Sequence, residues 1–264
     1  PADIIDLFVR INSTGKALTA AEKRHARYYN SHFLREAGRL AKRYENYFKQ
    51  QNILSSGQIT RMKHVELICE LMISINQCDV INKKAALDRV MESDSFTKFQ
   101  VKTARDKTVR SLNRLKRMFP KLYQTRFRQI SDFYSMAILI AKFEEERLIL
   151  TDPKRNRKAW ELLIAFSNGV DTVRERQKKA LGPKVGQESY RDYLLTVIQS
   201  TDEVNQRRNR EQILRGLLQT LFKRKDSERL FSPEQRRILW NSASERKCAK
   251  CGKQVTWSDL TIDH

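Results

Sequence analysis

The sequence predicts a mainly α-helical fold, in which one multi-helix domain is followed by a small β-hairpin module at the C-terminus. Apolar residues recur every three to four positions through most of the 264-residue chain, the period of a helix that buries one face. No alternating apolar and polar run of strand length occurs before Val255. Cys248 and Cys251, separated by two residues, then mark a distinct metal-binding element.

The helices follow from the apolar spacing and from start and stop signals. Thr19 and Glu22 have the spacing of a capping box, and Ser232 followed by Pro233 is typical of a helix start. Ser55–Gly57 predicts a loop. The helix over 130–143 is apolar nearly all round, which predicts that it is buried. The predicted helices cover residues 3–11, 19–48 with a break near 30–31, 60–75, 84–91, 101–119, 130–143, 160–166, 190–198, 213–222 and a last one from 233.

The net charge is strongly positive, because 52 Lys and Arg stand against 31 Asp and Glu and give +21 with a pI near 10.0. This excess predicts a polyanionic partner, most commonly nucleic acid, and a ribosome-like or membrane-surface partner would produce the same excess. No apolar run approaches the roughly 20 residues of a bilayer span, so no membrane-spanning segment is expected. Only four cysteines occur, and Cys69 and Cys78 fit structural thiols, which predicts a reducing, cytoplasmic compartment.

Two segments are candidates for binding a phosphate backbone. Between Val101 and Ile130, ten Lys or Arg stand against the single acid Asp106. Four of these cations share one face of the predicted helix, beside its apolar stripe: Lys107, Arg110, Arg114 and Arg117. A second basic run contains Arg207, Arg208 and Arg210. The alternative for the first segment is an ordinary solvated helix face.

The last seventeen residues combine the cysteine pair with an acid-histidine pair. Val255–Trp257 and Leu260–Ile262 are short β-prone runs that predict a hairpin, with Trp257 in its core and Asp263 and His264 at the end of its second strand. Gly252 allows the tight turn that follows the second thiol. This layout resembles the first half of an HNH nuclease motif, so the module is expected to be a truncated ββα-metal hairpin.

The HNH resemblance implies specific roles for these residues. His264 would act as the general base toward the attacking water, and Asp263 would bind the hydrolytic metal, Mg or Mn. Cys248 and Cys251 would hold a structural zinc together with a second cysteine pair expected beyond His264. The residues shown are therefore expected to be inactive by themselves. The alternative is a zinc ribbon without catalysis, in which Asp263 and His264 only end a strand.

The amino-terminal segment Phe8-Val-Arg10-Ile-Asn12-Ser-Thr-Gly15 resembles the segment that closes the ParB/sulfiredoxin-like domain of GmrSD-type, modification-dependent restriction proteins. Many of those proteins end in an HNH module. The resemblance implies nucleotide hydrolysis or modification sensing, with a nucleoside triphosphate as cofactor, Arg10 and Asn12 beside its phosphates, and an Asp-Gly-Gln-Gln-Arg signature expected before Pro1. The alternative is an Arg at a helix end and an Asn in a turn.

Three regions are therefore expected: 1–24 as the closing segment of a ParB/sulfiredoxin-like domain, 25–231 as a basic helical domain, and 232–264 as the first half of an HNH module. The predicted function is metal-dependent cleavage of duplex DNA, modified or unmodified, in a prokaryotic restriction or anti-phage system. Two alternatives remain open. One is a non-catalytic nucleic-acid-binding protein with a structural zinc ribbon, and the other is a helical scaffold for an acidic protein.

Overall fold

A computed structural model describes residues 17–257 except 94, 151–152, 183, 200, 225–232, 243–244 and 249–250. The chain divides into two compact units, Pro1–Lys223 and Arg224–His264, here called the helical unit and the terminal unit. The predicted boundary between 231 and 232 lies outside the described residues, as do the predicted helix over 3–11 and the predicted strand over 260–262.

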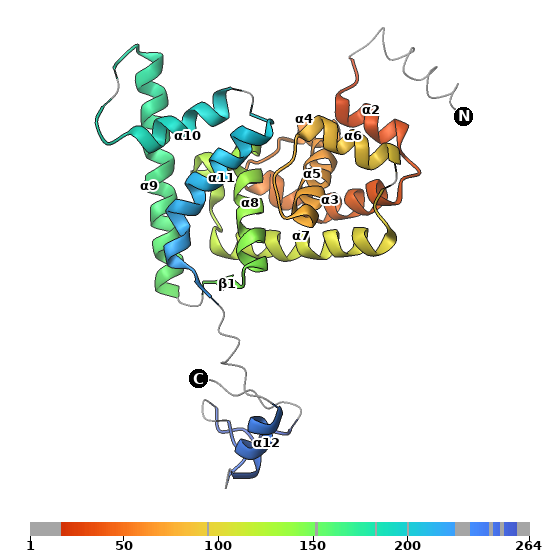
Figure 1. Cartoon of the computed structure of the whole chain (residues 1–264), viewed down its shortest axis with the longest axis vertical. Helices are drawn as coiled ribbons and strands as arrows, with labels where there is room; N and C mark the ends of the chain where they lie inside the picture. Colours follow the sequence, from red (N-terminus) through yellow and green to blue (C-terminus); the bar gives the residue numbers. More distant parts are fainter. Residues whose placement is uncertain are drawn as a thin grey trace. The chain divides into compact units, whose positions relative to one another are not determined.

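The prediction of a mainly helical protein is confirmed (Figure 1). Two-residue strands β1 (Leu148–Ile149) and β2 (Lys223–Arg224) pair with each other, whereas no strand was predicted there. The helices of the helical unit are α2 (Ala20–Arg27), α3 (His32–Gln50), α4 (Ser56–Thr60), α5 (Lys63–Gln77), α6 (Lys83–Ser93), α7 (Lys98–Met118), η2 (Leu122–Gln124), η3 (Arg126–Arg128), α8 (Ile130–Glu145), α9 (Pro153–Lys178), α10 (Glu188–Ile198), α11 (Val204–Leu218) and η4 (Gln219–Leu221).

The predicted capping box is confirmed at the start of α2. The Thr19 amide donates to Oε2 of Glu22 at 2.6 Å, and the Glu22 amide donates to Oγ1 of Thr19 at 3.3 Å. The hydrogen bond from the Thr19 backbone holds the pKa of Glu22 below its usual value. The predicted break near 30–31 is confirmed too, because Ser31 caps α3 by accepting from the Leu34 amide.

Three predictions about helices need correction. The loop predicted at Ser55–Gly57 is wrong, because Ser55 and Gln58 form a second capping box that starts α4. The helix predicted over 160–166 runs from Pro153 to Lys178, and the one predicted over 213–222 begins at Val204 and ends at Leu218. The lengths of both helices were underestimated, because small or charged side chains such as Ala159 in α9 and Arg207 in α11 continue their buried faces.

The core of the helical unit is built around α5 and α8. Helix α8 is buried along its length, as its all-round apolar sequence predicts. Helix α5 packs against α3, α7 and α8, and the edge of the Phe48 ring meets the Phe133 ring with centroids 5.8 Å apart. The Cys69 thiol is fully buried in α5, as predicted for a structural thiol, whereas Cys78 is exposed.

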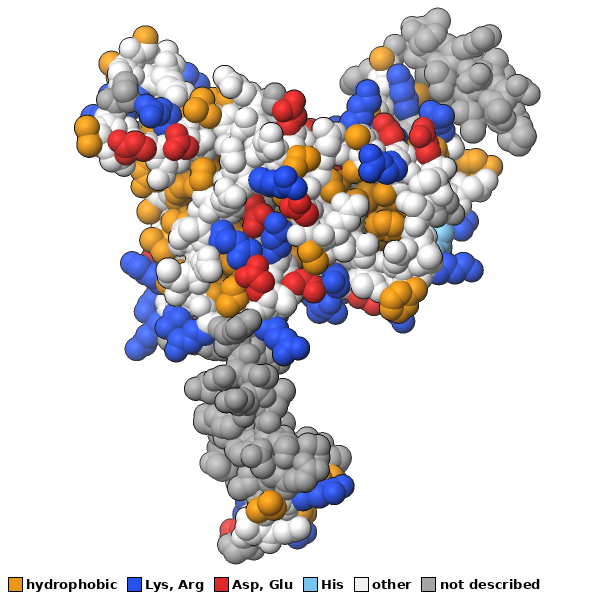
Figure 2. Space-filling model, viewed as in Figure 1, with side chains coloured by type: hydrophobic (Ala, Val, Ile, Leu, Met, Phe, Trp, Pro, Cys, Tyr) orange, Lys and Arg blue, Asp and Glu red, His pale blue; other side chains and the backbone are white. Residues whose placement is uncertain are grey.

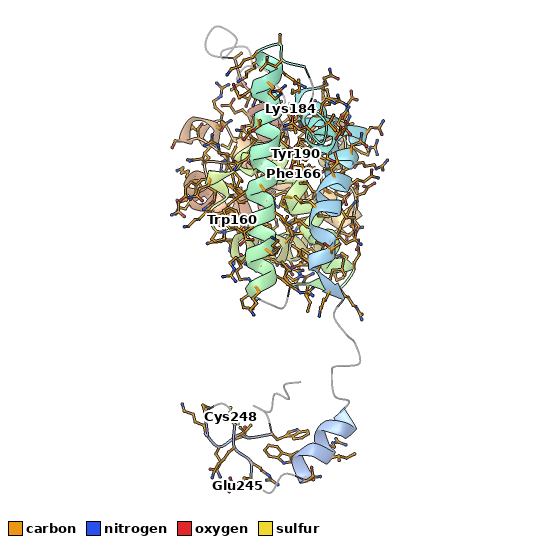
Figure 3. The ribbon with its side chains drawn as sticks, turned by 90° about the vertical axis from the view of Figure 1, so that its left-hand side faces the viewer. Trp160, Phe166, Lys184, Tyr190, Glu245 and Cys248 are labelled. Atoms are coloured by element: carbon orange, nitrogen blue, oxygen red, sulfur yellow. The ribbon has the colours of Figure 1, made fainter. Side chains whose placement is uncertain are left out.

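Helices α9 and α10 pack closely at one end of the helical unit. Figure 3 shows Phe166 of α9 beside Tyr190 of α10, and their ring centroids are 5.5 Å apart. A Cβ placed on Gly169 would lie 2.6 Å from the Tyr190 ring, so this position has no room for a side chain. In the terminal unit, α12 (Pro233–Ser242) begins at Pro233, as the sequence predicts.

Candidate functional site: a cysteine knuckle and basic helical surfaces

The two thiols of the terminal unit lie on a tight backbone turn. The Cys248 amide donates to the Lys253 carbonyl at 2.8 Å, and the Gly252 amide donates back to the Cys248 carbonyl at 2.8 Å. Gly252 has a φ of +69°, a left-handed conformation that glycine adopts without a steric penalty. The turn therefore folds Cys251 back toward Cys248, which is the local geometry of a metal-binding knuckle.

A short antiparallel pairing closes this turn, in a different place from the predicted hairpin. Lys247 and Gln254 form a β-bridge, and the Val255 amide donates to the Arg246 carbonyl at 2.8 Å. Val255 therefore pairs with the segment that precedes the knuckle, whereas the sequence predicted that it pairs with residues 260–262. The predicted role of Trp257 as hairpin core is wrong, because Trp257 is 43% exposed and meets the edge of Trp240 of α12 with ring centroids 5.7 Å apart.

The cysteine knuckle fits half of a zinc site. Thiolate sulfur is the donor that structural zinc prefers, and a closed structural site takes four ligands. Figure 3 shows Cys248 on the knuckle, apart from the helix of the same unit. Within the described part of the chain no group of three or more His, Cys, Asp or Glu side chains is arranged so that it could hold a metal ion. Asp263, His264, Arg10 and Asn12 lie outside the described residues, so their predicted roles stay predictions.

Arg207 of the predicted basic run is buried in the interior of the helical unit. Its side chain is 2% exposed and donates to Glu70 at 2.8 Å, to Asp202 at 2.8 Å and to the Ile81 carbonyl at 3.1 Å. Its guanidinium carbon also lies 4.1 Å from the centroid of the Tyr134 ring. Burial alone would lower the pKa of Arg207, but the Glu70 carboxylate, the Tyr134 hydroxyl and the hydrogen bond to Asp202 together outweigh it and raise that pKa.

Arg210 is buried as well, while Arg208 is on the surface. Arg210 is 0% exposed and donates to Oγ of Ser135 at 3.0 Å and to the Thr201 carbonyl at 2.7 Å. The Arg208 side chain is 51% exposed and pairs with Asp79 at 2.6 Å. The two buried arginines hold α11 to the core, so only Arg208 of this run is accessible to a nucleic acid.

The four cations predicted to share one face of α7 divide into two pairs. Lys107 binds Glu145 of α8 at 2.7 Å. Arg114 is buried, pairs with Glu144 of α8 at 3.5 Å and donates to the Leu148 carbonyl of β1 at 2.7 Å. Arg110 and Arg117 are exposed, and neither has an ion-pair partner among the described residues. The first pair secures the α7–α8 packing, and the second is available to a ligand.

A groove of about 670 Å³ lies between α3 and α7 and brings Arg110 together with arginines that the sequence interpretation missed. Leu40 and Val109 lie at its apolar part, and its charged lining consists of Glu36, Arg39, Arg43, Arg105, Asp106 and Arg110. On α3, Arg35, Arg39 and Arg43 recur at four-residue spacing. Like charges at this spacing repel by about 0.2–0.5 kcal/mol per pair unless an anion lies nearby. The four-residue spacing of these arginines was therefore the feature of the sequence from which an anion-binding surface on α3 could have been predicted.

On a different surface, over α8 and α11, the acidic and basic side chains form ion pairs with one another. Figure 2 shows acidic and basic side chains interleaved there. Lys142 binds Glu211 at 2.5 Å, and Arg215 binds Glu146 at 2.7 Å. A phosphate approaching this surface would have to displace carboxylates from their partners, so the surface is poorly suited to a polyanion.

Scans against protein-family models find no match to this chain, and searches of curated proteins and of solved structures find none either. The class is therefore defined by the residues themselves: a mainly helical, strongly basic protein with a cysteine knuckle in its terminal unit. Among the described helices, none is both long enough and apolar enough to cross a bilayer.

Proposed function

We propose that this chain is part of a metal-dependent endonuclease that cleaves duplex DNA with an HNH site. The observation that carries the proposal is the cysteine knuckle, in which Cys248 and Cys251 are folded together by the Lys253 and Gly252 hydrogen bonds. Asp263 and His264 follow Cys251 by twelve and thirteen residues. In HNH modules such a knuckle fixes the hairpin that presents the catalytic histidine. The net charge of +21 supports a polyanionic substrate.

The proposed chemistry assigns one task to each residue. Cys248 and Cys251 hold a structural zinc, which stabilises the module without entering the reaction. His264 accepts the proton of the attacking water, since a neutral imidazole titrates near neutral pH. Asp263 supplies a carboxylate to Mg or Mn, and that ion, when bound, neutralises charge on the scissile phosphate.

The biological setting is proposed from the amino-terminal segment. Its resemblance to GmrSD-type proteins supports a prokaryotic restriction or anti-phage role, with an amino-terminal domain that hydrolyses a nucleotide or senses modified DNA. Arg10 and Asn12 would border the phosphates of that nucleotide, because a guanidinium and an amide are both suited to phosphate oxygens.

Plasmid cleavage by the natural full-length protein tests the proposal. With Mg²⁺ or Mn²⁺ present, the protein should nick or linearise supercoiled DNA, and His264→Ala should abolish cleavage while the zinc content per chain is unchanged. Cys251→Ser should instead lower the zinc content. His32→Ala, in the helical unit, serves as the matched histidine control and should cleave normally.

Two results would contradict the proposal. Normal cleavage by His264→Ala would exclude His264 as the general base. Zinc and DNA binding without any metal-dependent cleavage by the natural protein would favour the non-catalytic zinc ribbon, because the knuckle alone is compatible with that function.

A further inference from the structure

The groove between α3 and α7 is formed by two parallel helices whose register is fixed by side-chain contacts. Arg105 donates to Glu36 at 3.2 Å, and the Tyr44 hydroxyl donates to Asn113 at 2.8 Å. Further along, the Gln51 side chain donates to the Pro120 carbonyl at 3.1 Å. These contacts advance in the same direction along both segments, so α3 and α7 run parallel with a constant offset, and residues 36–43 and 105–110 line the groove between them.

The acids of the groove are already neutralised by their neighbours. Glu36 binds both Arg39 and Arg105, and Asp106 binds Arg105 at 2.9 Å. Arg43 stacks near Tyr44, and its guanidinium carbon lies 5.8 Å from the ring centroid. Neither Arg43 nor Arg110 has an ion pair within the described residues, although both line the groove. The groove therefore keeps an uncompensated positive charge.

More exposed cations without an ion pair extend this charge beyond the groove: Arg35 and Lys42 on α3, and Lys102, Lys116 and Arg117 on α7. The cations named on α7 run from Lys102 to Arg117, which at 1.5 Å per residue is about 22 Å, or roughly six to seven base pairs of B-form DNA. The row of cations is thus long enough to follow a phosphate backbone over more than half of one helical turn.

We propose that the α3–α7 groove binds the sugar-phosphate backbone of duplex DNA, with Arg43 and Arg110 as phosphate ligands on its two sides. The inference rests on the proposed function for the identity of the polyanion. Guanidinium groups suit phosphate oxygens because they donate two parallel hydrogen bonds. Contacts of this kind position DNA on the protein without reading its sequence, so the groove supplies affinity and orientation.

Charge reversal at the two free arginines tests the proposal. The double variant Arg43→Glu/Arg110→Glu is compared with Arg174→Glu/Lys179→Glu, called the α9 control. It reverses two exposed cations, Arg174 of α9 and Lys179 directly after its end, and changes the net charge equally. Binding of a fluorescent duplex to the full-length protein is measured by anisotropy, without added Mg²⁺, between about 50 and 200 mM salt. Cleavage of plasmid DNA is measured separately.

Loss of two phosphate contacts should weaken binding on the order of 10- to 100-fold and reduce the slope of log affinity against log salt by about 2. The α9 control should stay within about threefold of the parent, because its cations lie away from the groove. Arg43→Lys/Arg110→Lys, which keeps both charges, should retain most of the affinity. The thermal unfolding midpoints of the variants show that each one is folded.

Unchanged DNA affinity in the groove variant would overturn the proposal, and so would an equal loss in the α9 control, which would indicate a diffuse charge effect. Absence of duplex binding by the parent at low salt, with binding of an acidic polypeptide instead, would overturn it in favour of a protein partner. The nuclease proposal fails by a different result, because cleavage by His264→Ala leaves the binding comparison unaffected.

Discussion

Replacing Arg207 by methionine removes the cation that joins α11 to the core of the helical unit. The Arg207 side chain is 2% exposed, and its partner Glu70 on α5 is 3% exposed. The substitution keeps most of the side-chain volume, so the main effect is electrostatic. Glu70 then keeps one ion-pair partner, Lys83, whose Nζ lies 3.1 Å from Oε1 of Glu70.

The expected destabilisation is large for a single substitution. Removing one member of a buried ion pair typically costs about 3–5 kcal/mol, because the other charge remains buried without its partner. The remaining contact to Lys83 places the expected value at the low end, about 3 kcal/mol. For a unit of this size, 1 kcal/mol shifts the unfolding midpoint by about 2–4 °C, so Arg207→Met should lower it by about 6–12 °C.

The adjacent residue provides a matched control. Arg208 pairs with Asp79 at 2.6 Å, but its side chain is 51% exposed, and an exposed pair contributes about 0–1 kcal/mol. Arg208→Met should therefore lower the midpoint by less than about 4 °C. The double variant Arg207→Met/Glu70→Leu should recover part of the loss, because it also removes the carboxylate that Arg207→Met leaves with only one partner.

Thermal unfolding followed by circular dichroism measures all of these variants under one condition. Equal midpoints for Arg207→Met and Arg208→Met would refute the assignment of Arg207 to a buried ion pair. A further readout separates structure from recognition: below its unfolding transition, Arg207→Met should bind duplex DNA as the parent does, since its guanidinium faces protein acceptors.

Two further predictions concern close packing and pH. Gly169→Ala should destabilise the helical unit by about 1–3 kcal/mol, because its Cβ would overlap the Tyr190 ring, whereas Gly216→Ala, with no atom within 4 Å, should stabilise it by about 0.5–1 kcal/mol. Equal effects on the unfolding midpoint would contradict this. Burial lowers the pKa of His64, so protonation favours the unfolded chain and the stability is lost as pH falls below about 6.5. His64→Gln should flatten the fall of the midpoint between about pH 6.5 and 5, and parallel curves for the two proteins would exclude His64 as its cause.

The helical architecture was predictable because large apolar residues and side-chain caps mark most of its helices. Thr19 and Glu22 could be identified as a capping box directly from their spacing. The length of α9 was missed because its buried face continues through small residues, with Ala159 and Val170 beyond the apolar segment 160–166. The sequence contains that three- and four-residue spacing, but side chains of this size predict a buried helix face only weakly. They are identified as a buried face in the structure, where α9 packs against α10.

The basic run at 207–210 shows why charge alone could not locate the binding surface. Arg207 and Arg210 are three residues apart and therefore share a helix face, and the same face continues through Leu214 and Leu218. The helix was predicted to begin at 213, so the arginines could not be placed on this buried stripe. On α3 the same reasoning works in the opposite direction: Arg39 and Arg43 lie opposite buried positions such as Ala37 and Ala41 and face outward. A cation becomes a candidate phosphate ligand only when its helix face and its internal partners are both known, and Arg43 and Arg110 meet both conditions.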